Sequence, residues 1–168
     1  DIPSTQIEAG VDRTNLRQII QQKYAPPCRC IRCREPKNEK INWNKVKIKV
    51  MEYAASGGKE FFISAEETEK DLLIGFIRMR FPAQFLRLEI TKNSALIREL
   101  HVYGTATGIG DEGNVQHRGW GKKLLQKAEE IAKKAGKDKM VVISGVGARE
   151  YYRKLGYKKE GEYMAKKL

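Results

Sequence analysis

The sequence predicts an α/β fold, with a mixed central sheet flanked by helices and a small N-terminal appendage that is helical and rich in cysteine. Three observations predict it. Within residues 45–53, Lys45, Lys47 and Lys49 alternate with Val46, Ile48 and Val50, which is the period of a half-buried strand. A glycine-bearing loop at 116–121 runs directly into a segment with one apolar face at helical spacing. Residues 140–143 are a short apolar strand, and 168 residues are enough to bury a substantial core.

The N-terminal part of the chain is expected to form a basic helix followed by a polar segment. Residues 12–24 begin with cap-type side chains and then carry apolar residues at helical spacing. Prolines at positions 26 and 27 end this helix. The next segment, 28–36, has only one strongly apolar residue besides its cysteines, Ile31. Something other than a hydrophobic core must therefore hold it.

The three cysteines, Cys28, Cys30 and Cys33, lie within six residues of one another. In a chain without a secretion signal, such a cluster favours metal binding over a disulfide framework. Three thiolates would supply a tetrahedral, structural zinc site that needs a fourth ligand. His101 and His117 are the only histidines, and His101 is favoured because His117 lies inside the glycine loop. Free thiols are the alternative.

The central part of the chain is expected to form meandering strands. Residues 45–53 and 59–65 flank a turn signal at 56–58, so they should pair as a hairpin. Residues 72–80 make a third strand, which a Phe-Pro pair stops. Residues 95–103 are the next apolar run and make a fourth strand.

The C-terminal part is expected to alternate helices and strands. A helix follows Gly119, with its apolar residues on one face, and Gly136 caps its C-terminal end. The strand at 140–143 comes next. A second helix is expected at 148–155, and a final strand from residue 157 towards 168.

The charge of the chain favours polyanionic partners. Lys and Arg number 33 against 21 Asp and Glu, which gives a net charge of +12, and nucleic acid and phosphorylated cofactors suit such a balance. A solvated basic surface is the alternative. No apolar run is long enough to span a membrane. The chain starts at Asp1 without a signal-peptide pattern, so we expect a cytoplasmic protein whose sequence begins within a longer chain.

The loop at 116–121, Gln-His-Arg-Gly-Trp-Gly, predicts a phosphate-binding site. Two glycines spaced by one residue let the backbone approach a ligand closely. The first N–H groups of the following helix have no partner inside the helix, and with the helix dipole they form an anion site. A pyrophosphate would fit there, although the loop matches neither the P-loop nor the dinucleotide-binding pattern. An incidental glycine turn before a helix is the alternative.

The Gln-x-x-Gly-x-Gly pattern of this loop resembles the acetyl-CoA pyrophosphate loop of the GNAT acetyltransferases. Further segments together resemble the acetyltransferase domains of the Elongator catalytic-subunit family, and the resemblance spans nearly the whole chain. These segments are 1–5, 28–34, 98–104, 116–121, 144–147 and 151–157. The resemblance implies a GNAT fold and an acetyl-CoA-dependent part in modifying the wobble uridine of tRNA.

The same resemblance divides the chain into a linker at 1–40, with the basic helix and the zinc-binding segment, and a GNAT domain at 41–168. Members of that family also contain a radical-SAM domain with an iron–sulfur cluster and SAM. This chain is too short for that barrel, and its Cys-x-Cys-x-x-Cys spacing is not the usual Cys-x-x-x-Cys-x-x-Cys. We therefore expect a C-terminal fragment that binds acetyl-CoA, with the cluster and SAM confined to a missing N-terminal domain.

The resemblance also implies where acetyl-CoA binds. The strand at 95–103 would offer backbone groups to the pantetheine arm, and the glycine loop would hold the pyrophosphate. The implied cofactor-binding residues are His101, Val102, Tyr103, Val115, Gln116, His117, Arg118, Gly119, Trp120, Gly121 and Lys122.

Three residues are candidates for catalysis. The resemblance implies that Tyr151 or Tyr152 protonates the departing CoA thiolate, and only one can face the thioester because adjacent helical residues point about 100° apart. Glu99 shares one face of its strand with His101 and Tyr103 by strand alternation. Its carboxylate could serve as a general base, with an ordinary ion pair as the alternative.

A basic group in the first part of the chain is the candidate contact for tRNA phosphates, with a solvated basic face as the alternative. Its members are Arg13, Arg17, Lys23, Arg29, Arg32 and Arg34. Two other functions stay open. One is a lysine acetyltransferase acting on proteins, which the basic charge disfavours for lysine-rich substrates because like charges repel. The other is a zinc-stapled RNA-binding module, in which zinc holds the N-terminal segment together and which would bind tRNA without cleaving acetyl-CoA.

Overall fold

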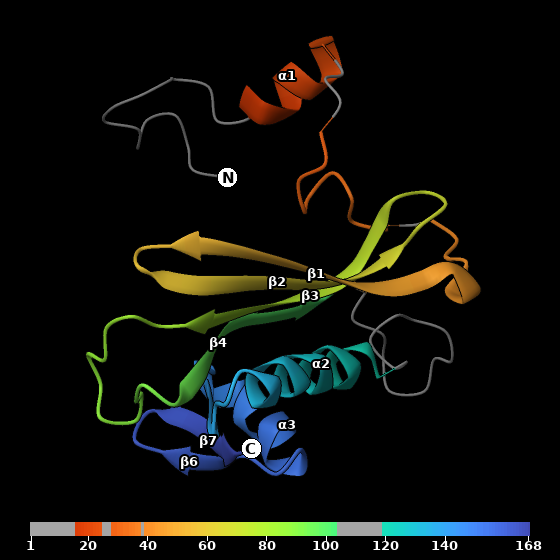
Figure 1. Cartoon of the computed structure of the whole chain (residues 1–168). Helices are drawn as coiled ribbons and strands as arrows, with labels where there is room; N and C mark the ends of the chain where they lie inside the picture. The colour runs from red at the N-terminus through yellow and green to blue at the C-terminus, as the bar shows by residue number, and fades with distance from the viewer. Residues whose placement is uncertain (1–15, 25–27, 38, 104–118) are drawn as a thin grey trace. The chain divides into compact units, whose positions relative to one another are not determined.

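The computed structural model describes residues 16–24, 28–37, 39–103 and 119–168 (Figure 1). They belong to two compact units, Asp1–Cys33 and Arg34–Leu168. In the first unit, α1 spans Leu16–Tyr24 and lies within the helix expected at 12–24. The functional division of the chain after residue 40 stays a prediction.

The second unit contains the predicted mixed sheet. Its described residues form seven strands in the order β1-β2-β3-β4-β5-β7-β6. Only β4 and β5 pair in parallel, and the other neighbours are antiparallel. The strands are β1 (Val46–Ala55), β2 (Gly58–Glu67), β3 (Leu72–Phe81), β4 (Ser94–Val102), β5 (Lys139–Val142), β6 (Lys158–Glu160) and β7 (Tyr163–Lys167).

The hairpin expected at 56–58 is confirmed. Ser56 and Gly57 have φ angles of 46° and 68°, so both central residues of the turn are left-handed. Such turns match the right-handed twist of the strands that they join. β1 and β2 therefore pair in one unbroken register, from Ala55 opposite Gly58 to Val46 opposite Glu67.

Two helices follow the four-stranded meander. α2 (Trp120–Lys134) lies along one face of the sheet (Figure 1), and α3 (Arg149–Lys154) follows β5 after a short 3₁₀ helix. The apolar face predicted for α2 is confirmed, since its residues Leu124, Leu125, Ala128 and Ala132 are buried. They pack with inward side chains of β2, β3 and β4 in one core. No helix among the described residues is long and apolar enough to cross a membrane.

The C-terminal end differs from the expectation of one strand at 157–168. It forms two strands, β6 and β7, because Gly161 adopts a left-handed turn with a φ of 56°. A second difference concerns the strand expected at 140–143. Its last residue, Ile143, lies just outside β5. Its N–H donates to the carbonyl of Ile97 (3.0 Å), and the chain then leaves the sheet.

Arg34, the first residue of the second unit, bonds to the sheet and to the turn after β2. Its guanidinium pairs with Glu66 (2.7 Å) and with Asp71 (2.9 Å), and its carbonyl accepts the N–H of Leu73 (2.7 Å). Burial by itself would raise the Glu66 pKa, but hydrogen bonds from Arg34, Lys49 and Ser64 outweigh it and lower this pKa to about 2. The ionised carboxylate is therefore favoured in the folded state.

We expect the Glu66 pairing to make folding sensitive to acid. A carboxyl group whose pKa is depressed on folding contributes stability above its unfolded pKa, and that contribution is lost as the pH falls from about 4.5 towards 2. Glu66→Gln should lower the unfolding midpoint at neutral pH and flatten its decline over this window, as circular dichroism can measure. Glu52→Gln, in an exposed pair with Lys59, is the matched control. Equal pH profiles for both variants would contradict the prediction.

Candidate functional site

β4 and β5 lie side by side only at one end. Their parallel pairing ends at Ile97, which lies opposite Val142. The N–H of Ile143 makes the last bond between the two segments. β4 continues to Val102, so its backbone beyond Arg98 has no strand on the β5 side among the described residues. This open edge offers backbone groups to an extended ligand.

β4 contains a bulge at Arg98, where its register with β3 shifts by one residue. An extra residue resets which side chains face the core. Ile97 before the bulge and Leu100 and Val102 after it all pack against the core beneath α2. The bulge therefore leaves the side chains of residues 99 and 101 on the opposite face of the sheet.

The N-terminus of α2 has features of an anion site. Gly119 is the N-cap residue, with left-handed φ and ψ angles of 70° and 17° that glycine adopts without strain. Among the described residues no side chain caps this end, and the first turn holds no acidic residue. Lys122 and Lys123 add positive charge there, and the Lys123 ammonium lies over the Trp120 ring (4.2 Å). The unpaired N–H groups of this turn are suited to bind phosphate.

Tyr151 lies against the start of α2. A Cβ atom built on Gly121 would come within 2.8 Å of the Tyr151 hydroxyl oxygen and 3.7 Å of Val102 Cγ2. The absence of a side chain at Gly121 thus lets the hydroxyl reach the junction between α2 and the open end of β4. Tyr151 is 40% exposed, and partial burial raises its pKa above the ordinary value. The hydroxyl therefore holds its proton at neutral pH.

Tyr152 points into the core instead. It is 6% exposed, and its ring centroid lies 5.7 Å from that of Tyr157. Burial, together with the neighbouring Tyr151, raises the pKa of Tyr152 to about 12. Of the two tyrosines between which the sequence does not choose, the structure brings Tyr151 to the start of α2.

Glu99, His101 and Tyr103 lie on the sheet face away from α2. The rings of His101 and Tyr103 meet edge to face at 4.5 Å, and Phe76 stacks on His101 at 5.7 Å. Glu99 pairs with Arg78 (3.5 Å), which is the ion pair considered as the alternative for this residue. Both side chains are about 40% exposed, so the pair is weak and can be exchanged for another partner.

Several predicted contacts lie outside the described residues. These are Arg13 in the basic group and Val115, Gln116, His117 and Arg118 in the glycine loop. Of the predicted loop contacts, Gly119, Trp120, Gly121 and Lys122 are described, and they form the beginning of α2. The Trp120 side chain is buried in the core, so this residue offers its backbone to a ligand.

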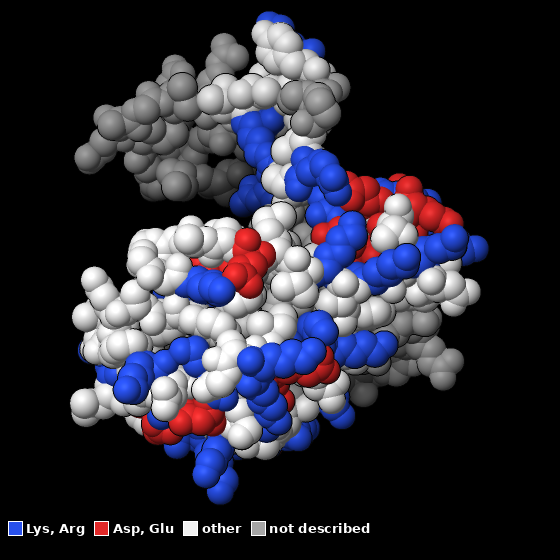
Figure 2. Space-filling model, in the orientation of Figure 1, with Lys and Arg blue, Asp and Glu red and all other residues white. Residues whose placement is uncertain are grey.

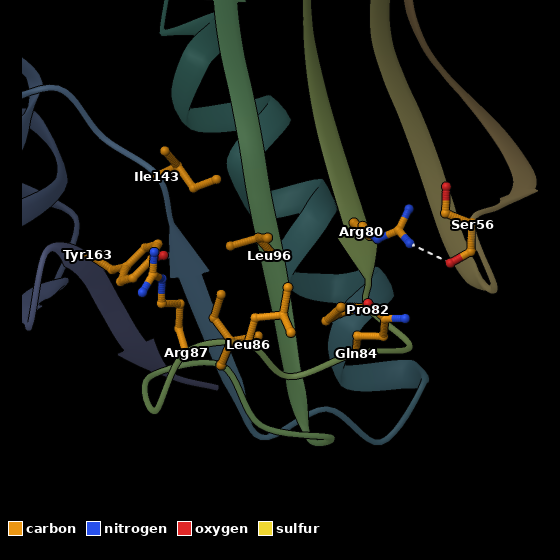
Figure 3. A pocket seen from close by; sticks show the side chains of 10 residues that line it. Ser56, Arg80, Pro82, Gln84, Leu86, Arg87, Leu96, Ile143 and Tyr163 are labelled. Carbon is orange, nitrogen blue, oxygen red and sulfur yellow. Dashed lines mark hydrogen bonds between the residues drawn. The ribbon is translucent and has the colours of Figure 1, made fainter.

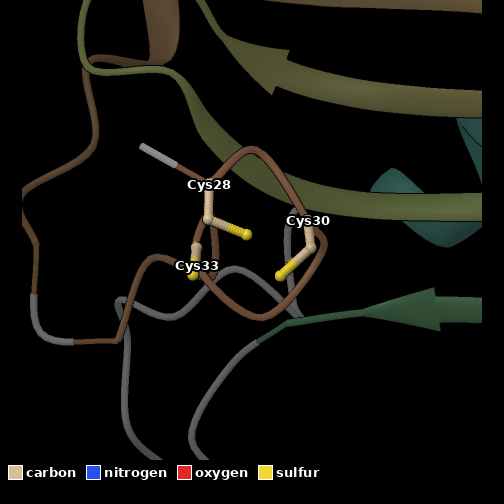
Figure 4. A group of neighbouring side chains, drawn as sticks. All are labelled: Cys28, Cys30 and Cys33. Carbon is tan, nitrogen blue, oxygen red and sulfur yellow. The ribbon is translucent and has the colours of Figure 1, made fainter. Parts of the chain in front are cut away.

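The three cysteines come together as predicted (Figure 4), with their sulfur atoms all within 4.8 Å of one another. Arg17 donates to the sulfur atoms of Cys30 (2.8 Å) and Cys33 (3.2 Å). Hydrogen bonds from the Cys33 backbone and the Cys28 thiol lower the pKa of Cys30 to about 6. The neighbouring thiols raise the pKa of Cys33. The donor set fits a metal that prefers thiolates, and His101 as fourth ligand stays a prediction.

The basic residues proposed to contact RNA differ in their exposure. Lys23, Arg29 and Arg32 are exposed. Arg17 faces the thiols, and the Arg34 side chain is only 10% exposed in its pairs with Glu66 and Asp71. Arg34 is therefore poorly placed to reach a phosphate.

Sequence reasoning missed the bulge at Arg98 and a pocket beside the loop at 82–93. The signal for the pocket is present in that loop, where Leu86 and Leu88 are 81% and 97% exposed on either side of Arg87. Exposed leucines next to an arginine are typical of a binding surface.

The chain matches the Acetyltransferase (GNAT) family over residues 18–157. It is 44% identical over 181 residues to the tRNA uridine(34) acetyltransferase of Methanocaldococcus jannaschii. The alignment covers 100% of this chain and 34% of that protein. It is 40% identical over 179 residues to Elongator complex protein 3 of Danio rerio, covering 100% of this chain and 33% of that protein. The structure of archaeal Methanocaldococcus infernus Elp3 with an N-terminal deletion (1–46) matches with a TM-score of 0.84 at 43% sequence identity. The match covers 100% of the present chain and 42% of the Elp3 chain.

These relatives are similar to the chain over its whole length, and the chain spans about a third of the length of the two curated ones. Strands β1 to β5, the parting of β4 from β5 and the first turn of α2 lie within the matched residues. The chain therefore belongs to the GNAT acetyltransferase family.

Proposed function

We propose that this chain is the acetyl-CoA-binding acyltransferase domain of an enzyme that modifies the wobble uridine of tRNA. The observation that carries the proposal is the meeting of the open β4 edge with the uncapped N-terminus of α2, beside the Tyr151 hydroxyl. The first-turn N–H groups of α2 would bind the pyrophosphate. The open backbone of β4 from Glu99 to Val102 would hydrogen-bond the pantetheine arm. In the family pattern, residues 115–118 complete the pyrophosphate loop.

Tyr151 is the proposed general acid. Cleavage of a thioester leaves a thiolate, and a hydroxyl that donates its proton to that sulfur stabilises the leaving group. The raised pKa of Tyr151 keeps the proton in place at neutral pH, as this role requires. Glu99 is the proposed base for the incoming nucleophile. It lies on the opposite face of β4 and would exchange its bond to Arg78 for one to the acceptor.

tRNA is the proposed substrate because relatives over the whole chain are named tRNA uridine(34) acetyltransferase, and because the net charge is +12. Lys and Arg side chains lie over the α2 side of the second unit (Figure 2). Affinity for tRNA should fall with added salt as phosphate contacts are screened. Complete modification would also need a radical-SAM domain with its iron–sulfur cluster and SAM, which the family resemblance assigns to longer enzymes.

Zinc is the proposed metal at Cys28, Cys30 and Cys33. The close approach of the three sulfur atoms and the lowered pKa of Cys30 support thiolate ligation in the first unit. A fourth ligand would close the coordination sphere and make the site structural. The metal would then hold together a segment that has few apolar side chains of its own.

Release of CoA from acetyl-CoA by the purified chain, with and without tRNA, tests the proposed function. We expect acetyl-CoA to bind in isothermal titration calorimetry and CoA to be released when tRNA is added. Release onto lysine peptides without tRNA would favour the protein acetyltransferase instead. Binding of tRNA without any binding of acetyl-CoA would favour the zinc-stapled RNA-binding module and overturn the proposal.

Gly121→Ala is expected to slow tRNA-dependent release of CoA by roughly tenfold, about 1.4 kcal/mol. The added Cβ would meet the Tyr151 hydroxyl at 2.8 Å and push it away from the start of α2. In a Tyr151→Phe background the same Cβ meets a ring carbon and Val102 Cγ2, both at 3.7 Å, which are ordinary contacts. A double-mutant cycle on the rate of CoA release should therefore show that Gly121→Ala costs little there. Equal costs in both backgrounds would contradict this account.

A further inference from the structure

A pocket of about 570 Å³ lies in the second unit, beside the loop that joins β3 to β4 (Figure 3). Its walls include side chains from the end of β3, this loop, β4, the segment after β5 and the beginning of β7. Those that matter for its chemistry are Arg80, Gln84, Arg87, Leu96, Ile143 and Tyr163. Its volume is within the range of sites for small ligands.

The pocket adjoins the place where β4 and β5 separate. Leu96 precedes the last β4 residue paired with β5, and Ile143 makes the last hydrogen bond between the two segments. Leu96 alternates with Ala95 and Ile97, which belong to the core beneath α2, so it faces the other side of the sheet. The pocket therefore opens on the face that also carries Glu99. A group bound there would lie next to the open β4 edge.

The arginines of the pocket are held differently. Arg80 pairs with Glu60 (2.7 Å) and donates to the carbonyl of Ser56 (3.0 Å), which fixes its guanidinium. Glu60 is buried and also pairs with Arg98 (2.9 Å), so one carboxylate serves two arginines. Arg87 reaches towards Tyr163 in Figure 3, and it pairs with no acidic side chain among the described residues. The pocket thus keeps an excess of positive charge.

The described residues of the walls include no carboxylate. A lysine side chain would bring a third cation next to two guanidinium groups, of which, in the described part of the chain, only Arg80 has a carboxylate partner, so this pocket selects against it. An anionic ligand would instead meet Arg87, which can bind phosphate with two parallel hydrogen bonds. Leu96, Ile143 and the Tyr163 ring offer apolar and aromatic surface, of the kind on which unpaired RNA bases stack.

We propose that this pocket binds one nucleotide of an RNA strand, with its base against Tyr163, Leu96 and Ile143 and its phosphate at Arg87. The proposal rests on the proposed function in taking RNA as the substrate, and it deepens that function by giving the place of the acceptor nucleotide. Arg80 is a positioning residue for the phosphate side, and buried Glu60 holds it in place.

Titration of the ¹⁵N-labelled chain with 5′-UMP, uridine and inorganic phosphate, followed by NMR, tests the proposal. UMP should shift the amide signals of Leu96, Ile143 and Tyr163. Arg87→Ala should weaken UMP binding by about tenfold, because a guanidinium–phosphate contact is lost, and should leave uridine binding unchanged. Arg153→Ala is the matched control, since this arginine lies on α3 in an exposed pair with Glu150 and outside the pocket.

Three results would overturn the proposal. UMP signals confined to residues 119–122 would place the nucleotide at the N-terminus of α2 instead. Phosphate that binds as tightly as UMP would show an anion site without a base subsite. Equal weakening by Arg87→Ala and Arg153→Ala would show unspecific attraction to a basic surface. Calorimetry with acetyl-CoA separates the two proposals, because failure of the wild-type chain to bind acetyl-CoA would overturn the proposed function whatever UMP does.

Discussion

Tyr151→Phe is expected to slow tRNA-dependent release of CoA by about 10²- to 10⁴-fold, the usual contribution of a general acid or base. The substitution removes one oxygen atom at the junction of α2 with the open end of β4. It leaves the ring contact with Tyr152 in place, so the fold should persist. Because the hydroxyl acts on the departing sulfur, the loss should appear in kcat, while the affinity for acetyl-CoA changes little.

Tyr152→Phe is the matched control, since it removes the same atom from the adjacent residue. Tyr152 is buried in the core against Tyr157, whereas Tyr151 is 40% exposed, so we expect the Tyr152 hydroxyl to take no part in the reaction. We expect a rate within about twofold of the wild-type chain and a small change in unfolding temperature. A large loss of rate in Tyr152→Phe with none in Tyr151→Phe would exchange the two roles and contradict the placement of the acid.

The elements that the sequence predicts well are those specified by short-range patterns. The turn at Ser56 and Gly57 needs positive φ angles, and the residues that tolerate them are visible in the sequence. The buried face of α2 follows from helical spacing, and the start of this helix follows from Gly119, which is its left-handed N-cap residue. For these features the local rule and the tertiary contacts agree, so the sequence is sufficient.

The features that sequence reasoning missed depend on partners far away in the chain. The bulge at Arg98 arises from pairing with β3, and a strand pattern alone does not show where an extra residue enters. The choice of Tyr151 over Tyr152 depends on where α3 lies relative to Gly121. The final segment also divides at Gly161, whose turn lets β6 fold back on β7. Such choices are made by packing, which periodicity does not record.

The pocket beside residues 82–93 also depends on residues that are far apart in the chain, so the sequence alone does not predict it. Its walls come from β3, the following loop, β4, the segment after β5 and β7, so no continuous motif describes it. The charge that makes it selective depends on Glu60, which is distant in sequence from Arg80 and Arg98 but lies between them in space. A composition of +12 indicates a polyanionic partner but not the place where it binds.

Loss of one of the thiolates of Cys28, Cys30 and Cys33 is also expected to have a large effect. It should lower the metal content of the chain and the order of the first unit. Structural zinc sites bind with about 10–16 kcal/mol, so removing one of four ligands should weaken zinc binding by roughly 100-fold or more. Cys30→Ser removes the thiol with the lowered pKa and the sulfur to which Arg17 donates. Inductively coupled plasma mass spectrometry should find about one zinc per parent chain and far less in the variant.

The same variant should open the first unit to protease while the second unit resists. No residue of α1 is buried, so its order depends on something other than a core of its own. Limited proteolysis should therefore cut within residues 16–33 after Cys30→Ser or after chelation, whereas Arg32→Ala, which keeps all three thiols, should stay protected. His101→Ala tests the fourth ligand: parental zinc affinity in that variant would contradict His101. A parent chain that lacks zinc and still resists protease would show that the thiols hold the segment without a metal.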